Sequence, residues 1–83
     1  MIRVETLQEV LNLVAAATPA TDRETLQEST DLYDLGLDST TAVILMLEIE
    51  EKFGITFPDS MITEATFRTP GALSFVVESL LQP

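Results

Sequence analysis

The chain has 83 residues, of which 46% are hydrophobic and 22% are charged, and its 14 acidic and 4 basic residues give a formal net charge of −10. This length predicts one small domain, residues 1–83, and the apolar content argues against intrinsic disorder. The negative charge disfavours nucleic acid and anionic membranes as partners and favours basic protein surfaces, while the lack of cysteine excludes disulfides and thiolate metal sites.

The N-terminal residues Met1–Glu5 become polar too early for a secretory signal peptide. No stretch of the sequence approaches the roughly 18 uninterrupted apolar residues of a membrane span. We therefore expect a cytoplasmic protein that does not enter a membrane.

The first predicted element is an amphipathic helix, in which Leu7, Val10, Leu11 and Val14 follow the i, i+3, i+4, i+7 pattern. The Thr18-Pro19 pair ends this helix. A long, turn-rich connection, residues 18–38, follows, and a loop of that length in a compact domain usually has a function. Its apolar side chains are expected to hold it against the helices; they are Leu26, Leu32, Tyr33, Leu35 and Leu37.

The second predicted helix covers residues 40–53, with Ser39 as its N-cap and Gly54 as its C-cap glycine. At about 100° per residue, one face of this helix is apolar and is expected to face the core. Its members are Ala42, Leu45, Met46, Ile49 and Phe53. The opposite face mixes aliphatic and acidic residues, namely Ile44, Leu47, Glu48 and Glu51. A helix with a purely structural role would seldom have such an outer face.

Two further helices are predicted before the chain ends. Asp59 is expected to cap a short helix containing Met61 and Ile62, and Thr69-Pro70 is typical of an N-cap followed by the first helical residue. The last helix has an apolar stripe made of Leu73, Val76, Val77, Leu80 and Leu81. Because no useful strand alternation occurs, we predict an all-α bundle of three main helices and one short helix, with a long loop between the first two.

Three motifs occur in order along the chain: Asp34–Ser39 (DLGLDS), Leu47–Phe53 (LEIEEKF) and Phe57–Asp59 (FPD). With this spacing, in a short and acidic helical chain, they resemble the acyl carrier proteins and the related peptidyl carrier domains. The resemblance extends over essentially the whole length. It also includes stand-alone carriers that are charged with amino acids by truncated relatives of aminoacyl-tRNA synthetases.

The resemblance implies that Ser39 carries a 4′-phosphopantetheine arm, which a phosphopantetheinyl transferase takes from coenzyme A. The arm would hold acyl or aminoacyl groups as thioesters, loaded by a ligase and passed to biosynthetic enzymes. By the family pattern, Asp38 helps to place a magnesium ion during arm transfer, although no resident metal is expected. From the residues alone, Gly36 permits a sharp turn before the serine, and a helix N-terminus favours a phosphate. The chain has no histidine or thiol, so it is not expected to be an enzyme.

Two positions depart from the family pattern. Thr40 stands where leucine is usual, at the surface that the transferase contacts, and Ile44 replaces an acidic residue that fatty-acid carriers often use. The expected docking surface therefore has an apolar centre, Ile44 and Leu47, with acidic residues around it, Glu48, Glu51 and Asp34. These departures argue against the partners of a standard fatty-acid carrier.

The sequence leaves some assignments open. Ser39 could cap the helix without carrying an arm, and the chain could be an unmodified acidic adaptor of the same fold that acts only by binding proteins. The candidates for an acyl pocket are Met46, Phe57, Met61 and Ile62, although core packing is the simplest explanation for them. The acidic residues lack the spacing of a calcium loop. The protein is expected to be a monomer, and its cargo and pathway are not specified by the sequence.

Overall fold

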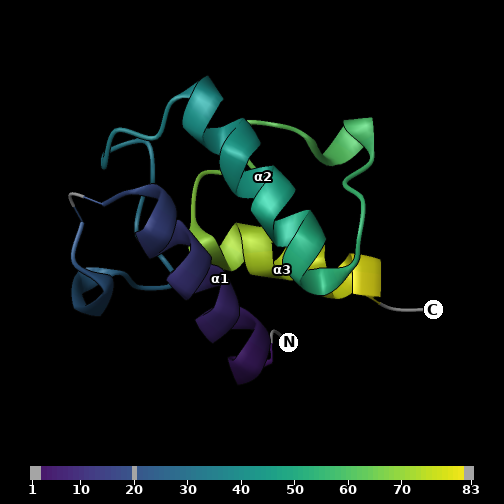
Figure 1. Ribbon diagram of the computed structural model, residues 1–83, viewed down its shortest axis with the longest axis horizontal. Coiled ribbons are helices and arrows are strands. Elements are labelled where there is room, and N and C mark those ends of the chain that lie inside the picture. Colours follow the sequence, from purple (N-terminus) through teal and green to yellow (C-terminus); the bar gives the residue numbers. More distant parts are fainter. Residues whose placement is uncertain (1–2, 20, 82–83) are drawn as a thin grey trace.

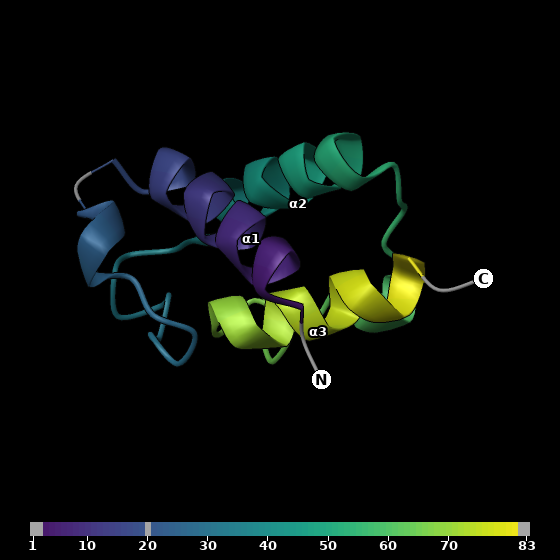
Figure 2. The ribbon, with the colours of Figure 1, turned by 90° about the horizontal axis from the view of Figure 1, so that it is seen from below.

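The computed structural model describes residues 3–19 and 21–81 as three α-helices around one core (Figure 1). The helices are α1 (Val4–Ala17), α2 (Ser39–Phe53) and α3 (Pro70–Leu81), and two single 3₁₀ turns, η1 (Arg23–Thr25) and η2 (Asp59–Met61), lie in the connections. Within these residues no strand occurs, so the all-α prediction is confirmed. Figure 2 shows α2 and α3 as two layers, and α1 packs against both.

The core is formed by the predicted helix faces. Val10 and Val14 of α1, and Leu45 and Ile49 of α2, are completely buried. On α3, Leu73 and Val77 complete the contact as predicted, whereas Leu81 is exposed because it lies at the end of the described helix. Burying a side chain of this size stabilises the fold by about 1.5 to 3 kcal/mol, so these helices depend on one another.

Three of the predicted helix ends agree with the structure: α1 ends at Ala17, just before Thr18-Pro19, α2 ends before Gly54, and α3 begins after Thr69. Gly54 follows α2 in the left-handed conformation with φ 67°, and its amide donates to Glu50 O at 2.9 Å. At the start of α3, the Thr69 hydroxyl accepts a hydrogen bond from the Ala72 amide at 3.0 Å. The start of α2 differs from the prediction, because Ser39 already belongs to the helix.

The predicted short helix is smaller than expected. It is one 3₁₀ turn in which Met61 N donates to Pro58 O, at 2.9 Å, and Ile62 N donates to Asp59 O, at 3.1 Å. Asp59 is the first residue of the turn and makes no side-chain cap, and Ile62 comes after it. The backbone of Pro58 is extended, and its carbonyl oxygen accepts the first hydrogen bond of the turn. The three residues therefore form this turn without a capping side chain.

The long loop between α1 and α2 is present, and part of it packs on the core as predicted. Leu26, Leu32 and Leu37 are buried, whereas Tyr33 is half-buried and Leu35 is exposed. The expectation that Leu35 holds the loop is therefore wrong. Leu35 lies in the turn that precedes Gly36, and its side chain is not among those that pack against the core.

The loop is fastened to the start of α3 by backbone hydrogen bonds. Leu32 N donates to Arg68 O at 2.7 Å, and Gly71 N donates to Glu28 O at 2.9 Å. A Cβ added at Gly71 would lie 2.7 Å from the Glu28 Cγ and 3.1 Å from the Glu28 carbonyl oxygen. The missing side chain at Gly71 therefore allows the loop to approach α3.

We expect Gly71→Ala to destabilise the fold even though alanine is the better helix former. The added methyl group pushes Glu28 away from α3, and overpacking of this kind typically costs about 1 to 3 kcal/mol, against a helix-propensity gain of about 1 kcal/mol. Chemical unfolding of the variant and the wild type measures the difference. An unchanged or increased free energy of unfolding would show that the loop shifts away from α3 without a loss of stability.

Candidate functional site

Ser39 is the first residue of α2, and Asp38 rather than Ser39 is the N-cap. The Asp38 backbone is extended, with φ −109° and ψ 178°, and its carboxylate accepts a hydrogen bond from the Thr41 amide at 2.8 Å. The prediction of Ser39 as N-cap is thus wrong by one residue. Aspartate and serine are comparable N-cap residues. Asp38 is the cap here because its carboxylate accepts the hydrogen bond from the amide of the third helical residue, Thr41. Ser39 itself is exposed in the first turn.

The approach to Ser39 is a tight turn at Gly36. Gly36 has φ 91°, a conformation that a side chain would strain, and its amide donates to Tyr33 O at 3.1 Å. The Leu37 amide donates a hydrogen bond back to Leu32 O at 3.1 Å, and the Leu37 side chain is buried. The turn thus fixes the chain on both sides of Gly36, so that Asp38 and Ser39 emerge at the surface.

The hydrogen bond from the Thr41 amide lowers the pKa of the exposed Asp38 carboxyl group below its usual range. A depressed pKa in the folded state means that Asp38 stabilises the fold fully above the pKa of an unfolded aspartate. This stabilisation disappears as the pH falls through the lowered pKa of the folded state.

Two substitutions test this arrangement. At pH 7 we expect Asp38→Ala to lower the melting temperature clearly, and Asp38→Asn to lower it much less, because asparagine also caps a helix. The deficit of Asp38→Ala should shrink as the pH falls below the ordinary aspartate pKa. Thermal unfolding followed by circular dichroism from pH 7 to pH 2.5 measures both effects. A deficit that does not change with pH would contradict the capping role of the charged carboxylate.

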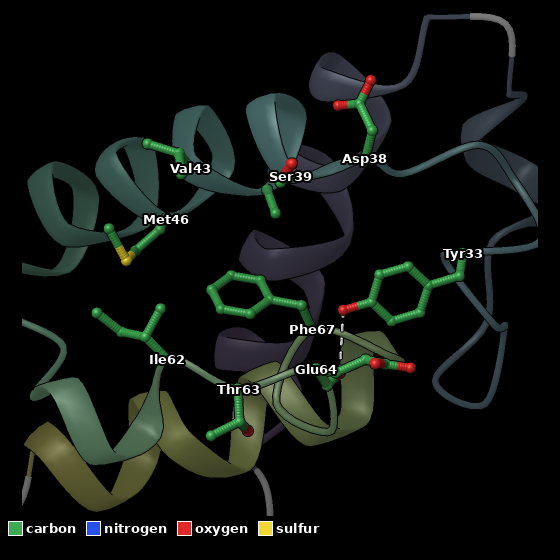
Figure 3. Close-up of a pocket in the computed structure, with 10 residues that line it drawn as sticks. Tyr33, Asp38, Ser39, Val43, Met46, Ile62, Thr63, Glu64 and Phe67 are labelled. Atoms are coloured by element: carbon green, nitrogen blue, oxygen red, sulfur yellow. Dashed lines mark hydrogen bonds between the residues drawn. The ribbon is translucent and has the colours of Figure 1, made fainter.

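A cavity of about 560 Å³ lies beside Ser39, between α2 and the segment that precedes α3 (Figure 3). It is lined by Tyr33, Asp38, Ser39, Ala42, Val43, Met46, Ile62, Thr63, Glu64 and Phe67. Most of its lining surface is apolar, and its two acidic lining residues are Asp38 and Glu64. A cavity of this size is within the usual range for small-molecule sites.

The structure sorts the four predicted pocket residues into two pairs. Met46 and Ile62 line the cavity, whereas Phe57 and Met61 are not among its lining residues. Phe57 is only 3% exposed and stacks on Phe67, with ring centroids 6.0 Å apart, so it belongs to the core behind the cavity. Phe57 and Met61 therefore do not line this cavity, and the acyl pocket itself stays a prediction.

Val43 also belongs to this site, although the sequence motifs did not identify it. Val43 lies one helical turn after Ser39 and one turn before Met46, so the i, i+4, i+7 spacing from the serine would have found it. It lines the cavity and is also 50% exposed. Val43 thus joins the cavity to the outer surface of α2.

Four of the five predicted docking residues lie on the outer side of α2. Ile44 is 49% exposed and Leu47 is 54% exposed, and Glu48 and Glu51 are exposed near them on the same helix. Asp34 is exposed in the loop before α2 rather than on the helix. We call the exposed residues Val43, Ile44, Leu47, Glu48 and Glu51 the outer α2 face.

The first turn of α2 fits a phosphodiester on Ser39. The serine provides an exposed hydroxyl as the ester oxygen, and the N-terminus of a 15-residue helix offers positive dipole ends to the phosphate. The space around Gly36 is open, since a Cβ built there has no atom within 4 Å. Charge repulsion from Asp38 is weak because both groups would face water.

The model of the phosphopantetheine attachment site family matches residues 8–74 of the chain. The chain belongs to this family. An aminoacyl carrier protein of Agrobacterium fabrum is 40% identical over 58 residues, which is 70% of each chain. An acyl carrier protein of Rubrobacter xylanophilus is 33% identical over 78 residues, 94% of this chain and 95% of the relative. Family membership makes the protein a carrier with phosphopantetheine as its prosthetic group, and not an enzyme.

Two solved structures have the same fold. They are crystal structures of an engineered Bradyrhizobium japonicum glycine:[carrier protein] ligase complexed with a carrier protein from Agrobacterium tumefaciens, one with ATP and one with AMP. The TM-scores are 0.76 and 0.74, at 32% and 36% identity, and the match covers 88% and 89% of this chain and 97% and 96% of the matched chains. In these structures a carrier of this fold binds a ligase.

Other kinds of site receive no support from residues 3–19 and 21–81. Among them, no group of three or more histidine, cysteine, aspartate or glutamate side chains could hold a metal ion. In the same ranges no helix is long and apolar enough to cross a membrane. The cytoplasmic location remains a prediction from the sequence.

Proposed function

We propose that the protein is a stand-alone aminoacyl carrier whose arm is attached at Ser39 and is charged by an amino acid:carrier protein ligase. The observation that carries the proposal is the exposed Ser39 at the start of α2, next to the mixed apolar and acidic outer α2 face. The ligase complexes of a carrier with 32 to 36% identity support this type of partner. A phosphopantetheinyl transferase would attach the arm, and the carrier would act as a monomer.

The outer α2 face favours a partner with an apolar groove and basic groups around it. Val43, Ile44 and Leu47 are each about half exposed, and an exposed apolar cluster on a small protein usually marks a contact site. The carboxylates of Glu48 and Glu51 would meet arginine or lysine at the rim, where charge guides association more than it holds the complex. The transferase would approach the neighbouring Thr40 and Asp38 at the first turn.

The cavity offers a place for part of the cargo. The apolar side chains of Met46, Ile62 and Val43 suit an aliphatic group, and the flexible thioether of Met46 adapts to different shapes. This favours cargo with an apolar side chain or short acyl chain over a strongly polar one.

Loading tests the proposal directly. The arm-bearing protein is incubated with the glycine:[carrier protein] ligase, ATP and single amino acids, and intact mass spectrometry follows the product. We expect an aminoacyl mass that disappears after treatment with hydroxylamine, which cleaves thioesters. If fatty acyl groups are transferred by an acyl-loading enzyme while no amino acid is accepted from this ligase, the aminoacyl assignment is wrong and the acyl alternative applies.

A further inference from the structure

The cavity beside Ser39 has one wall that belongs to no α-helix. This wall consists of residues 62–67, between η2 and α3, and contributes Ile62, Thr63, Glu64 and Phe67 to the lining. The facing wall is the first two turns of α2. We propose that Tyr33 and Arg68 are positioning residues that hold the wall 62–67 at a fixed distance from α2, so that the cavity is already formed in the unmodified protein.

The fastening of the wall to the loop involves four side chains. The Tyr33 hydroxyl donates to the Glu64 carbonyl oxygen at 3.1 Å, as the dashed line in Figure 3 shows. Arg68 donates to the Glu64 carboxylate at 2.7 Å and to the Asp31 carboxylate at 3.0 Å, and its guanidinium carbon lies 5.2 Å from the centroid of the Tyr33 ring. We call Tyr33, Arg68, Asp31 and Glu64 the wall tie.

The loop side of the wall tie is itself held in place. One Asp31 carboxylate oxygen accepts the amides of Tyr33 and Asp34 at 2.9 and 3.3 Å, and the other binds Arg68. The Leu32 amide between them donates to Arg68 O, and the Leu32 side chain is fully buried. Arg68 is thus fixed to a part of the loop that the core anchors.

The charged and titratable groups of the wall tie keep its hydrogen bonds intact at neutral pH. Burial, and secondarily the negative charge of Glu64, raises the pKa of Tyr33, although Arg68 opposes this, so the hydroxyl keeps its proton and remains a donor. Exposed ion pairs contribute little singly. Here Arg68 bridges two carboxylates and also covers an aromatic ring, and such an arrangement orders the groups that it joins.

The opposite end of the connection between α2 and α3 has its own fastening. The Glu50 carboxylate of α2 accepts the Phe57 amide at 2.8 Å, and Phe57 is buried against Phe67. Figure 3 shows Tyr33 and Glu64 of the wall tie on the side of the cavity where Ser39 and Asp38 lie, away from Met46 and Ile62. The wall tie therefore controls the end of the cavity that is nearer to Ser39.

Hydrogen exchange in the unmodified protein tests the inference without any arm or cargo. Tyr33→Phe removes only the hydroxyl bond, and Arg68→Gln removes both ion pairs. We expect the amides of Thr66 and Phe67 to exchange about five-fold faster in each variant, the effect of losing about one hydrogen bond, while the amide of Val14 in α1 is unchanged.

Two control variants remove similar groups away from the cavity. Thr25→Val deletes a hydroxyl bond of 2.8 Å to the Asp22 carbonyl oxygen, and Arg23→Gln deletes a guanidinium bond of 2.8 Å to Asn12. Neither should alter exchange at Thr66 or Phe67. Unchanged exchange in Tyr33→Phe, or an equal increase throughout the chain, would overturn the inference, and Tyr33→Phe still decides it if Arg68→Gln fails to fold.

The consequence for cargo rests on the proposed function and has a separate readout. In the arm-bearing protein charged with an octanoyl thioester, the Met46 methyl resonance should shift relative to the free-thiol form. We expect Tyr33→Phe to reduce that shift to less than about half, because the loosened wall no longer packs on the chain. No shift in the wild type would mean that the cavity takes no cargo, whereas the exchange experiment would still decide the role of the wall tie.

Discussion

Replacing Ser39 with alanine is expected to abolish attachment of the arm completely. The alanine variant has no hydroxyl to form the phosphate ester, and the cap of α2 is unaffected because Asp38 supplies it. Incubation with coenzyme A and a broad-specificity phosphopantetheinyl transferase, followed by intact mass spectrometry, should show one added phosphopantetheinyl group on the wild type and none on Ser39→Ala. The melting temperature should change little, since exposed substitutions usually alter stability by less than about 0.5 kcal/mol.

Ser60 provides a matched control, because it is an exposed serine in the 3₁₀ turn η2. Ser60→Ala should accept one arm at the wild-type rate. An arm on Ser39→Ala would place the attachment elsewhere. If the wild type itself remains unmodified and Ser39→Ala retains its cellular function, the protein is an adaptor that acts only by binding.

The second large effect is expected on the outer α2 face. Changing Ile44 or Leu47 to glutamate places a charge at the centre of the proposed contact with the ligase. Removing a central apolar contact from an interface often costs about 2 kcal/mol, so kcat/KM for loading should fall about 30-fold or more. Loading kinetics at several carrier concentrations measure this, and most of the loss should be in KM because the chemistry itself is untouched.

Phe75 allows a matched control for this result. It is an apolar residue on α3 with 65% exposure, more than either docking residue, and it does not belong to the outer α2 face. Phe75→Glu should load normally. Thermal unfolding completes the comparison, because a large loss of stability in Ile44→Glu would mean that Ile44 supports the fold. Equal loading defects in all three variants would argue for an effect of charge alone.

The helices and the core were predictable from the sequence because they depend on local periodicity. The apolar stripe of α2 fixed which side of that helix faces inward, and Gly54 and Thr69 marked helix ends through interactions that span three or four residues. The motif around Ser39 could also be recognised from the sequence. Its chemistry depends on a hydroxyl at a helix start, and this requires only neighbouring residues.

The cap of α2 was not predictable with the same certainty. Asp38 and Ser39 are adjacent, and either residue is a good N-cap. The choice depends on the backbone angles that the turn at Gly36 and the buried Leu37 impose on residue 38. A pattern of residue types does not contain those angles.

The cavity depends on contacts between distant parts of the chain. Tyr33 and Glu64 are 31 positions apart, and Asp31 and Arg68 are 37 positions apart. The apolar pattern gave Met46, Ile62 and Phe57 alike, but only the first two line the cavity, whereas Phe57 is buried against Phe67. Which apolar residues line a space and which fill the core is decided by tertiary packing.

The most direct test of the carrier function is the intact mass of the protein isolated from the cells that produce it, measured before and after treatment with hydroxylamine. We predict a chain that bears one phosphopantetheine on Ser39 and a further group that hydroxylamine removes. A mass equal to that of the bare polypeptide, in cells whose other carrier proteins bear the arm, would contradict the account.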